Sequence, residues 1–173
     1  MSEPNERIML TGVGAVRRNH ALEHATLHIL SRKYKNQSIG GYSDMSGFWI
    51  IGEIPTEDIQ EAVEEGLQRL RNGEAQLAIH PNCGTNYVIS GLFVGGLAWL
   101  GMLNSGGSIR KKLDRLPLIV SLVTVGLILA QPLGPLFQQK VTTDSNPGGL
   151  SIYEITHFMR HGVNMHRIST HHL

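Results

Sequence analysis

Cysteine is almost absent from this chain, which has one, Cys83, in 173 residues. No disulfide can form within the chain, so a small secreted domain held together by disulfides is excluded. Neither sign of charge predominates, because 15 lysines and arginines are balanced by 14 aspartates and glutamates. Without a basic stripe interleaved with aromatic residues, nucleic acid is not expected as a partner. Phosphate-binding loops, dinucleotide fingerprints and G-x-S-x-G motifs are missing as well, which argues against the corresponding enzyme classes.

Charged residues are missing from two long stretches, Ala75–Ile109 and Leu116–Gln139, and the basic sequence RKKLDR lies between them. At 1.5 Å per residue, the apolar runs in these stretches are about 25 to 33 Å long as helices, close to the ~30 Å hydrocarbon core of a bilayer. We expect two transmembrane helices, at about 85–104 and 116–137, that form a multi-pass hairpin in the cell membrane, with the lipid bilayer as partner. The alternative is that both runs are core helices of a soluble protein.

Glycines and basic residues bear on how the two helices of this hairpin pack and on how the hairpin is oriented in the membrane. Gly91, Gly95 and Gly96 place small residues about one turn apart in the first helix, which predicts that the two helices approach closely there. The basic loop favours the cytoplasmic side of the membrane. Three basic residues flank the other ends of the helices, so the orientation stays open.

The N-terminal segment has the mixed charge pattern of a globular surface. Good helix formers without proline predict a helix over about Val16–Tyr34. Acidic residues in a first turn and arginines in a last turn predict a second helix over 55–73. Compact apolar runs predict strands at Phe48–Ile54 and at AQLAI, residues 75–79.

The last segment, 140–173, contains β-favouring residues around a turn at Asn146–Gly149 and predicts two or three short strands. Both ends of a hairpin emerge on one side of a membrane, so these strands can return to the N-terminal segment. We therefore expect a small α+β domain with a two-helix transmembrane hairpin inserted before C-terminal strands. The expected parts are 1–84, 85–139 and 140–173.

Histidines gather in the stretch NHALEHATLH, residues 19–28. His20 and His24 are four residues apart, so on a helix both imidazoles project from one face. With Glu23 they form the H-x-x-E-H pattern of the inverzincins. Two neutral imidazoles and a third protein ligand would leave one zinc position for a water molecule, whose proton Glu23 would accept. The motif thus predicts zinc as cofactor, His20 and His24 as ligands, and Glu23 as the catalytic base.

A third ligand is available in HPNCGTN, directly after the second predicted strand. His80 and Cys83 are both of a type that binds zinc, and a loop at this place can reach the helix. His80 is the first candidate and Cys83 the second. The segment also has a structural interpretation, because its proline and glycine are typical of a turn and a lone cysteine is often a buried apolar residue.

The histidine helix has a structural interpretation too. Its histidines would then donate hydrogen bonds to nearby carbonyls, and Glu23 would pair with an arginine such as Arg18 or Arg69. The histidines near the C-terminus, among them His166, would form a solvated tail or, if the strands return, approach the site.

The stretch HALEHATLHIL, followed by GGYSDMSGFWIIGEIPTEDIQEAVEEGLQRL, resembles the opening of the pitrilysin and insulinase metallopeptidases. In that family an H-x-x-E-H helix precedes a Gly-Gly turn, a strand and an amphipathic helix. The resemblance implies zinc binding by His20 and His24, with Glu23 as base. The family takes its third ligand from a glutamate far downstream, and in this chain that distance falls in the apolar run, where no acidic residue stands.

A second resemblance spans nearly the whole chain and rests on the segments HALEHAT, GFWIIGE, GEAQLAIHPNCGTN, LAQPLGPL and VTT. They are similar to an uncharacterised family of small membrane proteins from cyanobacteria and related photosynthetic bacteria. That resemblance implies membrane residence and no established activity.

Two functions are compatible with these patterns. The first is a membrane-anchored zinc hydrolase of the peptidase type, acting on a peptide substrate. The alternative is a non-catalytic assembly or scaffold protein that binds a partner membrane protein, with or without a structural metal. The short chain, which lacks a recognisable second lobe, favours the alternative.

Overall fold

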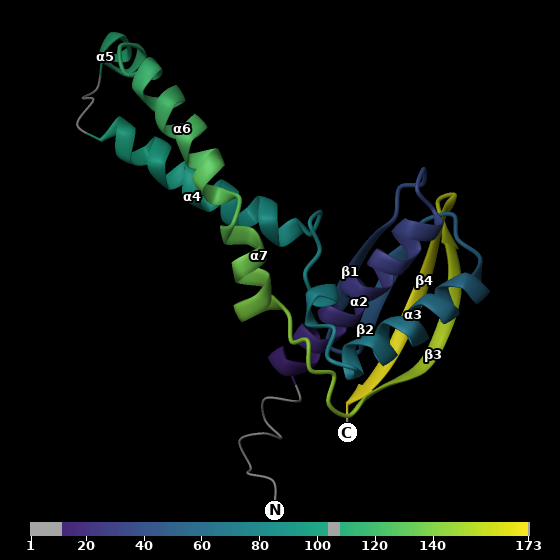
Figure 1. Cartoon of the computed structure of the whole chain (residues 1–173). Helices are drawn as coiled ribbons and strands as arrows, with labels where there is room; N and C mark the ends of the chain where they lie inside the picture. The colour runs from purple at the N-terminus through teal and green to yellow at the C-terminus, as the bar shows by residue number, and fades with distance from the viewer. Residues whose placement is uncertain (1–11, 104–107, 173) are drawn as a thin grey trace, which may run out of the picture. The chain divides into compact units, whose positions relative to one another are not determined.

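A computed structural model describes residues 12–103 and 108–172. The chain divides into two compact units (Figure 1). The first combines Met1–His80 with Gln139–Leu173, and the second is Pro81–Gln138. The first unit is therefore built from the segments that precede and follow the second unit in the sequence.

The first unit is an α+β structure with a four-stranded antiparallel sheet in the order β1-β2-β4-β3. This confirms the predicted α+β class of the domain. In chain order its elements are α2 (Val13–Lys33), β1 (Gly40–Asp44), β2 (Gly47–Ile51), α3 (Thr56–Arg71), a 3-10 helix η1 (Ala75–Ala78), β3 (Leu150–Arg160) and β4 (Val163–His172).

The C-terminal strands complete the sheet, because β4 pairs along β2 from Met165 to Ser169. Strands β3 and β4 are longer than expected, and they join at His161 and Gly162 rather than at the predicted Asn146–Gly149 turn. Both turn residues have positive φ, 52° and 77°. Two positive φ values give a hairpin turn whose twist matches that of the strands, and glycine adopts this conformation without strain.

Helices α2 and α3 pack on the sheet and enclose the apolar core (Figure 1). Leu22 from α2, Ile59 from α3, and Phe48, Ile50 and Ile168 from the sheet are fully buried. Side chains alternate between the two faces of a strand, so Phe48 and Ile50 reach the core together. The helix predicted over Val16–Tyr34 and the helix predicted over 55–73 are both confirmed, within a few residues at their ends.

Two predictions for short segments are wrong. AQLAI was expected to be a strand, but Ala75–Ala78 forms a 3-10 helix, two residues after Gly73, which has a φ of 88°. A short apolar run has no periodicity that separates a strand from a helical turn. Strand β1 was not predicted, because its sequence GGYSD is dominated by turn-forming residues. It forms by pairing with β2.

The second unit is helical. Its elements are α4 (Gly84–Met102), α5 (Ile109–Leu113), α6 (Leu116–Ala130) and α7 (Leu133–Phe137), with a π-type turn at Gln138–Thr142 continuing into the first unit. Two helices, Gly84–Met102 and Ile109–Ala130, are long and apolar enough to cross a membrane. Within α4, all of which is described, only Gly101 is buried, and within α6 only Gly126 and Ala130.

The close approach between α4 and α6 occurs at glycines other than those expected. A Cβ on Gly126 would lie 2.7 Å from Leu97 Cδ1, and one on Gly101 would lie 3.1 Å from Leu122 Cδ1. Of the described atoms, none lies within 4 Å of a Cβ added to Gly91, Gly95 or Gly96. The prediction that those three glycines mediate the contact is therefore wrong, because their spacing in the sequence does not reveal which side of α4 meets α6.

Gly41 in β1 provides a test of the packing between α2 and the sheet. A Cβ there would lie 2.7 Å from the Trp49 carbonyl oxygen and 2.8 Å from Glu23 Oε1, whereas at neighbouring Gly40 nothing described lies within 4 Å. Gly41→Ala is expected to lower the free energy of unfolding by about 1 to 3 kcal/mol, the usual cost of overpacking. Gly40→Ala should change it by less than about 0.5 kcal/mol. Denaturation of both variants measures the difference, and equal stability would contradict this packing.

Candidate metal centre

Helix α2 is fixed to the sheet by Asn19, which is fully buried. Its amide donates to the Asp44 carbonyl at 2.8 Å, and its Oδ1 accepts from the Thr170 hydroxyl at 2.8 Å. These bonds join α2 to the end of β1 and to β4. They determine the rotation of α2 about its axis and therefore the direction of the next side chains, His20 to His24.

His20 and His24 lie one turn apart on α2, with ring centroids separated by 4.2 Å. His20 Nδ1 donates to the Thr142 carbonyl at 3.0 Å, and His24 Nδ1 donates to the Ala78 carbonyl at 2.7 Å. A proton on Nδ1 leaves the lone pair on Nε2. Metal-binding histidines usually show this pattern, in which one ring nitrogen donates to a carbonyl and the other takes the metal.

His80 lies against the same side of α2. Its ring centroid is 4.8 Å from that of His28 and 5.7 Å from that of His24. His28 Nε2 donates to the Ile79 carbonyl at 2.8 Å. The backbone of Ala78 and Ile79 therefore runs along the histidine face of α2, held by two histidine hydrogen bonds.

Burial keeps two of these imidazoles neutral. It lowers the pKa of His24 to about 3, and the neighbouring His20 lowers it further, against the hydrogen bond to Ala78, which raises it. Burial, assisted by His28, lowers the pKa of His80 to about 4. The neutral ring is the form that binds a metal ion, so protons do not compete for these residues near pH 7.

Cys83 follows His80 by three residues. His20, His24 and Cys83 form a group that could hold a metal ion. The set of two imidazoles and one thiol fits zinc, which favours nitrogen and sulfur ligands.

Glu23 points from α2 toward β1 and is only 3% exposed. The Ser43 hydroxyl donates a hydrogen bond to its carboxylate. Burial raises the pKa of Glu23, while the Ser43 hydrogen bond and nearby His20 lower it, with a net increase. The suggested pairing with Arg18 or Arg69 is not found, because Arg18 pairs with Asp144 and Arg69 with Glu65 and Glu74.

The C-terminal histidines belong to the β3–β4 hairpin and not to a solvated tail: His161 is in its turn, and the others are in its strands. His166 is buried on β4, where its Nε2 shares a hydrogen bond of 3.0 Å with the Thr56 hydroxyl. Its ring lies 4.8 Å from that of His157. The expectation of a histidine-rich tail is wrong because this segment pairs with β2 and β3.

Sequence reasoning missed the groups that bond to the candidate site residues. The Thr142 and Ala78 carbonyls are backbone atoms, for which the sequence contains no signal, and Ser43 lies in the strand that was not predicted. Only the tertiary structure brings these atoms to α2.

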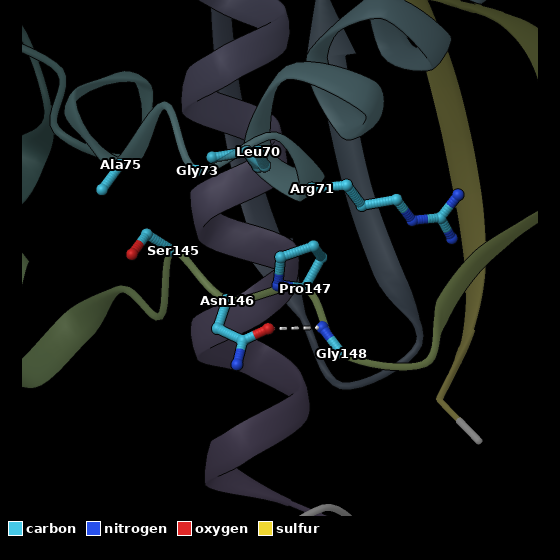
Figure 2. A pocket seen from close by; sticks show the side chains of 8 residues that line it. All are labelled: Leu70, Arg71, Gly73, Ala75, Ser145, Asn146, Pro147 and Gly148. Carbon is cyan, nitrogen blue, oxygen red and sulfur yellow. Dashed lines mark hydrogen bonds between the residues drawn. The ribbon is translucent and has the colours of Figure 1, made fainter.

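Described residues of the first unit line a cavity between the end of α3 and the loop Ser145–Gly148 (Figure 2). Its volume is about 330 Å³. It is lined by no histidine, cysteine or acidic residue. Another cavity, of about 230 Å³, is lined in part by Ala78, Ile79 and Thr143, so it adjoins the backbone that the histidines bind.

Residues 15–155 match a family described as a domain of unknown function (DUF6391). The chain belongs to this family. It is 32% identical over 152 residues to an uncharacterized protein of the cyanobacterium Picosynechococcus sp., covering 81% of this chain and 71% of the relative. No solved structure gives a significant match.

The family assignment confirms the predicted membership of an uncharacterised family with a cyanobacterial member. It does not confirm the resemblance to metallopeptidases, which remains a prediction based on the H-x-x-E-H spacing.

The lowered histidine pKa values predict how the metal-free protein responds to acid. In the unfolded chain these histidines bind protons below about pH 6.5, whereas folded His24 and His80 remain neutral down to about pH 3 and 4. The unfolded state thus binds more protons, and the free energy of unfolding should fall as the pH decreases below about 6.5, by up to about 1.4 kcal/mol per pH unit for each histidine. Denaturant titrations of His80→Gln should show a shallower decline, and an unchanged slope would contradict the assignment.

Proposed function

We propose that this protein is an integral membrane protein whose helical unit spans the bilayer and whose α+β unit binds zinc. The membrane part is supported by the exposed apolar side chains of α4 and α6. Leu92, Trp99 and Ile128 are each more than 60% exposed. The core helices of a soluble protein would bury such side chains, whereas lipid solvates them.

The proposed zinc ligands are His20 Nε2, His24 Nε2 and the Cys83 thiolate, with His80 as the alternative to Cys83. The observation that carries this proposal is the pair of Nδ1 hydrogen bonds to the Thr142 and Ala78 carbonyls, which directs both lone pairs to Nε2. Three protein ligands leave a fourth zinc position open, as in catalytic zinc sites.

We further propose that the site hydrolyses a polar bond, with a peptide as the candidate substrate. Bound zinc would supply Lewis acidity. Glu23 would act as general base, because burial raises the pKa of its carboxyl and so makes the carboxylate a stronger proton acceptor. The Ser43 hydroxyl orients its carboxylate. The cavity beside Ala78 and Thr143 offers space for part of a substrate.

A second candidate is a non-catalytic assembly protein in which the metal only stabilises the fold. The almost complete burial of Glu23 favours it, since a carboxyl enclosed by Ser43 and Gly41 also behaves as a structural link between α2 and β1.

Metal analysis tests the zinc site. Protein purified in detergent is expected to hold about one zinc ion per chain, and the double variant His20→Ala, His24→Ala less than about a tenth of that amount. His28→Ala is the matched control, because His28 lies on the same face of α2 but is not a proposed ligand, and it should retain zinc. Equal zinc content in the double variant and the control would end the proposal.

The variant Glu23→Gln distinguishes the proposed hydrolase from the non-catalytic assembly protein. The amide has nearly the same shape but cannot accept a proton, so zinc should remain while hydrolysis falls by about 10²- to 10⁴-fold. The appearance of new N-termini in a proteome-derived peptide library, measured by mass spectrometry, reports the activity. If the zinc-loaded wild-type protein leaves the library intact, the non-catalytic candidate is favoured.

A further inference from the structure

A cavity of about 380 Å³ lies in the helical unit, beside the end of α4, α5 and the start of α6. Seven of its eight lining residues are apolar, and the eighth is Lys112. Trp99 and Leu116, which line it, are 63% and 48% exposed. The cavity is therefore an open apolar hollow with one cationic side chain.

The basic residues around the cavity have different roles. The Arg115 guanidinium donates to the Gly101 and Leu103 carbonyls, at 3.1 and 2.8 Å, so it satisfies the C-terminal end of α4. Arg110, Lys111 and Lys112 are exposed on α5. Of these three, only Lys112 lines the hollow.

The hollow combines apolar side chains with one lysine, which is a combination suited to the surface of a membrane. Tryptophan is enriched at the level of lipid headgroups, where its ring is apolar and its N–H is polar. Basic residues next to a transmembrane helix attract anionic lipids. An apolar hollow with a lysine thus offers room for part of an acyl chain and a cation for the phosphate attached to it.

We propose that this hollow is a binding site for an anionic phospholipid, with the acyl chain against Trp99 and Leu116 and the phosphate on Lys112. This inference rests on the proposed insertion of the helical unit in a membrane. It adds a preference for one class of lipid, set by one lysine, and is independent of the zinc site.

Tryptophan fluorescence can test the site, because the chain has two tryptophans. In a Trp49→Phe background Trp99 is the remaining one. The full-length protein is reconstituted in phosphatidylcholine bilayers containing a small, equal fraction of either brominated phosphatidylglycerol or brominated phosphatidylcholine. Bromine quenches a nearby indole, so the ratio of the two quenching efficiencies measures lipid preference at Trp99.

Phosphatidylglycerol should be enriched at Trp99 by roughly fivefold, the effect of one basic residue at a membrane surface. Lys112→Gln should reduce the ratio toward one. Lys111→Gln, which removes the same charge from the adjacent residue, should leave most of it.

Equal quenching by the two lipids, or equal losses in Lys112→Gln and Lys111→Gln, would overturn the lipid site while leaving membrane insertion intact. Absence of quenching by either lipid would overturn both, because Trp99 would then be outside the bilayer.

Discussion

The hydrogen bond from His24 Nδ1 to the Ala78 carbonyl is the interaction on which the candidate site depends. It joins the middle of α2 to a segment 54 residues later in the chain, and it is buried. Breaking it would leave a buried carbonyl and a buried ring nitrogen without partners, which costs more than the bond itself contributes. The same bond selects the tautomer of the His24 ring and brings His80 beside it, so the fold of the η1 segment and the orientation of the candidate metal ligand His24 have one origin.

The first unit is assembled from distant parts of the chain. Its central pair of strands, β2 and β4, comes from opposite sides of the helical segment. The His20 bond to Thr142 and the Arg17 bond to Thr143 are further links of this kind, each spanning more than 120 residues. Closing such loops costs conformational entropy, which the apolar core around Leu22, Phe48 and Ile168 offsets.

Glu23 shows how a fold can prepare a group for two different roles. Burial raises its pKa and Ser43 holds its carboxylate, which suits a proton-transferring group. The same contacts join α2 to β1, which suits a structural one. Both roles depend on glycine at position 41, because a side chain there would occupy the space that the Glu23 carboxylate fills.

The sequence by itself determined the features that depend on local periodicity and composition: helices α2 and α3, the α+β class, two apolar helices, and the spacing of His20 and His24. These follow from patterns within one or two turns of chain. Tertiary structure alone decided strand β1, the helical turn at Ala75–Ala78, the glycines at which α4 meets α6, and the carbonyls that orient the histidines. Each depends on a partner distant in the chain, and pairing with such a partner can override a weak local preference.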